Sequence, residues 1–163
     1  MARIPHAVCT VRWDKPDKQA LESACIELMA AHSKRRIEAM QKGEAFDEPM
    51  PRCPGATTVV GLTLVSPIHD SPAAAIASLE SVVGELTEGV VVEVRGAQRT
   101  ARVRFEGWID GVGDRAAWAP APSELQVAAA GVRFAVSVSG FNGVGENKAK
   151  AIEVAKRIAG ALR

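Results

Sequence analysis

The chain has 163 residues, of which 47% are hydrophobic and 24% are charged. This composition is that of a globular protein and excludes an intrinsically disordered one. The 20 basic and 19 acidic residues leave a net charge of +1, so no overall field attracts nucleic acid or an anionic membrane.

The N-terminal part predicts a strand, a long helix and a second strand. Residues 7–13 alternate with the period of two of a half-buried strand. Residues 17–42 predict a helix that ends at Gly43. A proline-rich loop at 44–55 leads to 57–65, a β-branched run that predicts a central strand. The apolar stripe of the helix is expected at Leu21, Ala24, Cys25, Leu28 and Met29.

The remainder predicts a helix, two hairpins and a closing helix. Ser71 and Pro72 are a strong N-terminal pair for a helix that ends near residues 84–86. Residues 146–162 predict the closing helix. The strands of the first hairpin are expected at 89–95 and 99–108, those of the second at 125–129 and 132–139, and a short extra strand at 116–118.

Hairpins that follow one another without intervening helices force antiparallel pairing. The predicted order is β-α-β-α-β-β-β-β-α, which indicates an α+β fold: a mostly antiparallel sheet with helices packed on it, an α/β sandwich. A chain of this length fits one domain, spanning residues 1–163.

Location is predicted from the absence of targeting signals. No apolar run approaches the ~18–20 residues that span a bilayer, and the N-terminus lacks the apolar core of a signal peptide. We expect no transmembrane segment and a cytoplasmic location as the chain stands, or an extracytoplasmic one if an export segment was removed.

The three cysteines allow two interpretations. In one, Cys9, Cys25 and Cys53 are all reduced and Cys25 is a small core residue; in the other, a disulfide joins Cys9 to Cys53 and Cys25 is free. A zinc site with His6 and His32 is disfavoured, because only His6 and Cys9 have the close spacing of paired ligands. We expect no metal and no cofactor.

Catalysis is also not indicated. Gly-x-Ser-x-Gly is absent, and no spacing shows a histidine serving a cysteine as its base. We expect a protein that is not an enzyme.

Two glycine-rich loops are the candidate binding segments. In residues 110–115 the glycines supply positive φ and Asp114 is expected to cap or to pair with Arg115, while Trp108 and Trp118 on either side could line a ligand pocket. The second loop, with Asn142, Gly143, Gly145 and Lys148, exposes backbone N–H groups at the start of the closing helix, where an anion can bind.

The second loop also resembles the hairpin of helix-hairpin-helix DNA-binding proteins. Gly143, Val144, Gly145, Ala149 and Ile152 match that pattern, and Lys148 could reach a phosphate. The family needs a helix before the hairpin, whereas residues 132–139 predict a strand.

The C-terminal half resembles a second family. Residues 111–118, the strands at 124–127 and 132–139, and the helix ending at Leu162 are similar to the end of small actinobacterial lipoprotein and sensor-type domains. The resemblance implies a PsbP-like α/β sandwich without catalytic residues, which binds a ligand or partner outside the membrane. This chain departs from that family in lacking a signal peptide and lipobox.

The resulting hypothesis is a non-catalytic binding or interaction module for a protein partner or a small apolar ligand, held near Trp108, Trp118 and the two glycine loops. The alternative is a nucleic-acid-binding accessory protein that uses the loop from Gly143 to Lys148. The oligomeric state stays open.

Overall fold

The computed structural model describes residues 6–53, 55–65, 67–94, 96–141 and 143–163. Contacts divide the chain into two compact units. The larger unit comprises Met1–Val11 and Val59–Arg163, and the smaller one comprises Arg12–Thr58.

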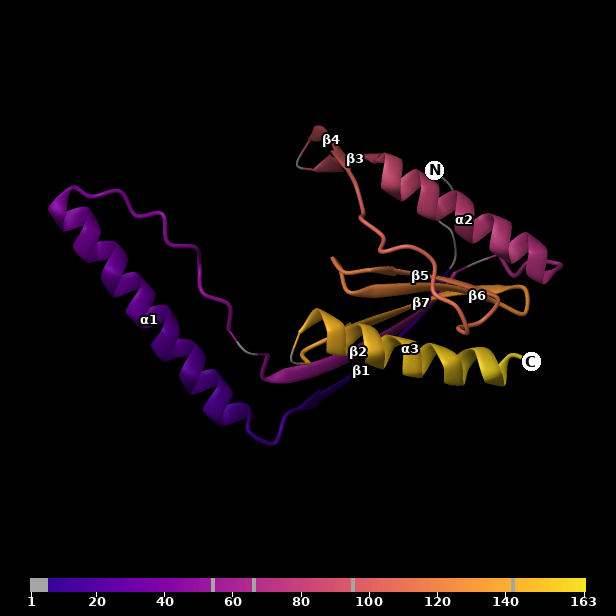
Figure 1. The fold of residues 1–163 in the computed structure, drawn as a ribbon, viewed down its shortest axis with the longest axis horizontal. Coiled ribbons are helices and arrows are strands. Elements are labelled where there is room, and N and C mark those ends of the chain that lie inside the picture. The colour runs from indigo at the N-terminus through magenta and orange to yellow at the C-terminus, as the bar shows by residue number, and fades with distance from the viewer. Residues whose placement is uncertain (1–5, 54, 66, 95, 142) are drawn as a thin grey trace. The chain divides into compact units, whose positions relative to one another are not determined.

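The fold class is α+β, as predicted. A five-stranded sheet has the order β1-β2-β7-β6-β5, and β3 and β4 form a separate two-stranded sheet. The pairs β2·β7, β7·β6 and β6·β5 are antiparallel. In chain order the elements are β1 (His6–Asp14), α1 (Lys18–Lys42), β2 (Thr57–Val65), α2 (Pro72–Glu88), β3 (Val90–Val94), β4 (Ala97–Ala101), β5 (Arg115–Ala119), β6 (Glu124–Ala129), β7 (Val132–Ser139) and α3 (Val144–Ala161) (Figure 1).

In the larger unit, α2 and α3 cover opposite faces of the sheet (Figure 1). The α2 helix begins as the sequence predicts, because the Ser71 hydroxyl accepts the N–H of Ala74 at 3.2 Å and Pro72 occupies the first turn. Its buried side chains Ala75, Leu79 and Val83 pack on Ala117 and Ala128 of the sheet. The α3 helix packs on the other face through its own small residues, Ala151, Ala155 and Ala159.

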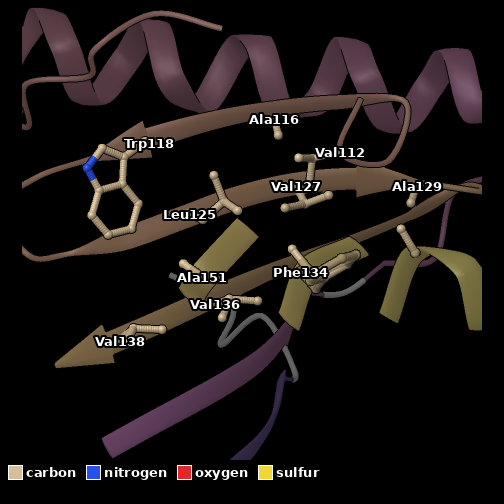
Figure 2. Close-up of a cluster of buried hydrophobic side chains, with 12 residues drawn as sticks. Val112, Ala116, Trp118, Leu125, Val127, Ala129, Phe134, Val136, Val138 and Ala151 are labelled. Carbon is tan, nitrogen blue, oxygen red and sulfur yellow. The ribbon is translucent and has the colours of Figure 1, made fainter. Parts of the chain in front are cut away.

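The main core lies between α3 and strands β5, β6 and β7. Trp118, Leu125, Phe134 and Val136 fill it and are fully buried, and Figure 2 shows these side chains converging from the three strands. Successive strand residues point to opposite faces, so Ala116 and Trp118 face α3 while Ala117 faces α2.

Four features of the sheet differ from the prediction. Residues 7–14 of β1 are exposed, where a half-buried strand was expected. The β3–β4 hairpin does not join the main sheet, because its strands have five residues each and mostly exposed side chains, leaving no buried face to dock. Residues 102–108 are not a strand beyond an isolated bridge between Trp108 and Ala117. The expected short extra strand is a full member of the sheet, β5, and pairs with β6 over five residues.

The smaller unit is a helix with an extended segment lying along it. The α1 helix ends at Gly43, whose φ of 69° is left-handed and whose N–H caps the helix. Residues 44–53 then run back along it (Figure 1). This segment covers only a narrow strip, so His32 is buried, Leu21, Cys25 and Met29 are half-buried, and Ala24 and Leu28 of the expected stripe are exposed.

None of the described helices combines the length and the hydropathy that crossing a membrane requires.

Gly113 and Gly111 offer a matched test of the packing between the 110–114 loop and β6. Both have positive φ, 62° and 73°, so alanine is strained at either position. A Cβ on Gly113 would lie 2.6 Å from the Ala128 carbonyl oxygen, whereas one on Gly111 meets nothing within 4 Å.

We expect Gly113→Ala to lower the free energy of unfolding by about 1–3 kcal/mol more than Gly111→Ala, because only the first must displace a strand backbone. Denaturant titration of both variants measures this. Equal losses would show that backbone conformation alone governs this loop.

Candidate functional site

An aromatic and a cationic side chain form a surface at the β5 edge of the larger unit. Trp108 is 39% exposed, and the Arg115 guanidinium lies over its ring, 4.1 Å from the centroid. Arg115 Nε is 3.1 Å from Glu80 Oε1 of α2, an ion pair whose orientation is not that of a hydrogen bond. Trp108, Arg115 and Glu80 thus come from three segments, and we call them the Trp108 surface.

The backbone holds this surface in place. The Glu106 N–H donates to the Trp118 carbonyl at 3.0 Å, and the Ile109 N–H donates to the Ala116 carbonyl at 2.8 Å. These bonds fix residues 106–109 against β5, so the Trp108 backbone is anchored on both sides. Arg115 alternates with Ala116 along β5 and therefore points toward the α2 face.

The two tryptophans do not line one pocket. Trp118 is fully buried in the main core on the α3 face (Figure 2). Arg115, which carries the contact with Trp108, lies three positions earlier in β5 and points to the opposite face. A ligand can therefore reach Trp108 from outside but not Trp118.

Asp114 fastens its loop to the rest of the larger unit. Its Oδ2 accepts the Ala130 N–H at 2.8 Å, and its Oδ1 lies 3.1 Å from Arg163 Nη2. The ion-pair partner expected from the sequence was Arg115, which pairs with Glu80 instead. A nearby hollow of about 200 Å³ is lined by Gly111, Gly113, Lys156, Ala159, Gly160 and Arg163.

The second glycine loop leads directly into α3. Gly143 is its N-cap, with φ 134°, and Gly145 already lies in the first turn. Lys148 Nζ is 2.8 Å from Glu106 Oε2. The ammonium group that the nucleic-acid hypothesis assigned to a phosphate is therefore already paired with a carboxylate. Strand β7 precedes the loop where the helix-hairpin-helix pattern needs a helix. Asn142 lies outside the described residues.

Sequence reasoning missed the partners of these groups. Glu80 is 35 positions before Arg115, and Glu106 is 42 positions before Lys148. No local pattern in the sequence links either pair. A hollow of about 350 Å³ beside Glu106 is lined by Arg104, Pro120 and Ala121 as well.

The cysteine pairing differs from both expectations. Cys53 forms a disulfide with Cys25, with a Cα–Cα distance of 5.0 Å, and Cys9 is free and exposed. The predicted Cys9–Cys53 bridge is therefore wrong, and so is the interpretation of Cys25 as a free core thiol. The reason is the course of residues 44–53, which bring Cys53 onto α1.

An ion pair holds residues 44–53 in the same alignment along α1 as the disulfide does. Arg35 Nε and Nη2 donate to the two Glu48 carboxylate oxygens at 2.9 and 2.7 Å. From Arg35 back to Cys25 the helix rises about 15 Å, and five extended residues from Glu48 to Cys53 cover about 16 Å. The His32 ring, which lies between these two links on α1, stacks edge-on against Phe46, two residues before Glu48, with ring centroids 5.1 Å apart.

Metal binding finds no support in the described part of the chain, where no three His, Cys, Asp or Glu side chains gather closely enough to hold an ion. Two of the five ligands considered, Cys25 and Cys53, are joined as a disulfide. The side chain of His6 lies outside the described residues.

Comparison with known proteins gives no relative: no family model, no curated protein and no solved structure matches this chain.

The disulfide predicts a simple labelling pattern. Without reductant, a thiol reagent should modify only Cys9 in the folded protein; after reduction and unfolding it should modify all three cysteines. Peptide mass spectrometry identifies the labelled sites. Labelling of Cys53 or Cys25 before reduction, with Cys9 protected, would contradict this pairing.

The ion pair predicts a titration shift. Hydrogen bonds from Arg35 hold the pKa of Glu48 below its usual value, so the pair stabilises the fold above the unfolded-state pKa and that contribution is lost as the pH falls through the folded-state pKa. Arg35→Gln should raise the Glu48 pKa toward the usual value in an NMR titration.

Glu153 is the control for that titration. Lys150 and Arg157 lower the pKa of Glu153 on α3, and Arg35→Gln should leave it unchanged. A Glu48 pKa that does not move in the variant would show that the Arg35 contact is absent in solution.

Proposed function

We propose that this chain is a non-catalytic interaction module that binds a protein partner through the Trp108 surface. The observation that carries the proposal is a half-exposed tryptophan with an arginine stacked on it, held by backbone bonds on both sides. Tryptophan and arginine are the residue types most enriched among side chains that dominate protein–protein binding energy.

The preorganisation of the surface favours binding. Ordering a long side chain on association costs about 0.5–1.5 kcal/mol, and here the Trp108 ring and Glu80 already hold Arg115. A partner would pack an apolar side chain on the free part of the Trp108 ring and direct a carboxylate to the Arg115 guanidinium, which forms charge-assisted hydrogen bonds.

A protein partner fits better than a small apolar ligand. Pockets for such ligands are concave and mostly apolar. The hollow beside Glu106 is lined by two charged residues, Arg104 and Glu106, among its four, and Trp118 is in the core. The exposed ring suits a surface contact with another protein.

The disulfide bears on where the module works. Structural disulfides persist in oxidising compartments and are rare where thiols are kept reduced. The Cys25–Cys53 pair therefore supports the extracytoplasmic alternative, in line with the resemblance to lipoprotein and sensor-type domains. We propose an oxidising compartment for this chain.

Photo-cross-linking in the native cell, followed by reconstitution, tests the proposal. A photoreactive residue at position 108 should form an adduct with a protein that mass spectrometry identifies. Trp108→Ala should then raise the dissociation constant for that purified protein at least about tenfold, as expected for a dominant interface residue. Arg115→Ala should weaken binding in the same direction.

Trp13→Ala is the matched control, because Trp13 is a tryptophan of similar exposure, 43%, on β1. It should leave the dissociation constant unchanged. Equal affinity of the Trp108→Ala variant and the wild type, with both folded by circular dichroism, would refute the proposal.

A further inference from the structure

The α1 helix carries a second apolar stripe that the returning segment does not cover. Ile26, Ile37 and Met40 are 69%, 55% and 68% exposed, values unusual for large apolar side chains on one helix. Ala30 and Ser33, also exposed, lie between them. We call these five residues the outer stripe; they belong to the smaller unit and lie apart in sequence from the Trp108 surface.

The spacing of the outer stripe is that of a helix–helix seam. Residues 26, 30, 33, 37 and 40 follow one another at intervals of four and three, the heptad pattern in which the seam faces a partner helix. The small Ala30 and Ser33 at the centre permit close approach of two backbones. The covered strip, with Cys25, Met29 and His32, lies to the side of this seam.

Charges beside the stripe select a partner. Glu22 and Glu27 flank its N-terminal half, whereas Lys34 and Arg36 flank its C-terminal half, and all four are exposed. Within the described residues Glu27 makes no ion pair, and Lys34 makes one long contact, 4.0 Å from Glu38. An acidic half and a basic half on one helix complement a second copy of the same helix that runs in the opposite direction.

We propose that α1 pairs antiparallel with α1 of a second copy of this chain through the outer stripe. In this antiparallel pair, Ile26 packs against Ile37 of the second copy, and Ala30 packs against Ser33 of the second copy. Glu27 faces Lys34 of the second copy, and two-fold symmetry repeats each contact. A parallel pair would instead bring Glu22 beside Glu27 of the other helix, a like-charge contact.

Sedimentation velocity of the full chain across about 1–100 µM, in a Cys9→Ser background that excludes a disulfide through the exposed thiol, tests the pairing. The chain should show a concentration-dependent dimer. Ile37→Glu should raise its dissociation constant at least about tenfold, because it places a charge in the seam. Leu28→Glu, at an exposed position on the opposite side of α1, is the control and should change the dissociation constant less than about twofold.

Charge exchange tests the direction of the pairing. Glu27→Lys alone should weaken the dimer about threefold or more, and adding Lys34→Glu should restore it. A parallel pair would behave in the opposite way, since Glu27→Lys removes the repulsion by Glu22. A chain that stays monomeric over the whole range, an Ile37→Glu variant that dimerises like the wild type, or a Glu27→Lys variant that dimerises more strongly would each overturn the proposal.

Discussion

Burial of both faces of strands β5, β6 and β7 is the constraint on which the larger unit depends. A strand covered on both sides must offer an apolar or small side chain at nearly every position, and β5 does so from Ala116 to Ala119. The two faces are filled differently: Trp118 and Phe134 occupy the α3 side, whereas alanines on the α2 side let that helix approach the sheet closely. The same alternation along β5 places Trp118 in the core and Arg115, three residues earlier, on the opposite face of the sheet.

That constraint explains which polar residues are free to bind. Two polar side chains of the glycine-rich loops, Asp114 and Lys148, hold the ends of the sheet and of α3 in place: Asp114 contacts Arg163 and the β6–β7 turn, and Lys148 pairs with Glu106. The Trp108 surface differs, because it adds an exposed aromatic ring to its ion pair: Trp108 is 39% exposed and lies under the Arg115 guanidinium. Rigid support beneath an exposed aromatic side chain is what a protein interface requires of its dominant residues.

The smaller unit, by contrast, has few elements that can bury apolar side chains. A single extended segment can cover only a narrow strip of a 25-residue helix, so α1 gains little from apolar burial. A disulfide and a two-point ion pair hold the segment instead, as cross-links do in small units that lack a core of their own. The side of α1 that this segment leaves uncovered carries isoleucine and methionine at seam spacing.

Local features were predictable because their causes are local. The α+β class, the Ser71–Pro72 start of α2, the Gly43 end of α1 and the β6–β7 hairpin follow from periodicity, capping and turn residues that lie within a few positions of one another. Only the tertiary structure decided the partner of Cys53, the separation of β3 and β4 from the main sheet, the faces taken by Trp108 and Trp118, and the ion pairs of Arg115 and Lys148. Each of these depends on contacts between residues that are distant in sequence. The path of the chain brings those residues together, and the burial of the packed segments stabilises the contacts.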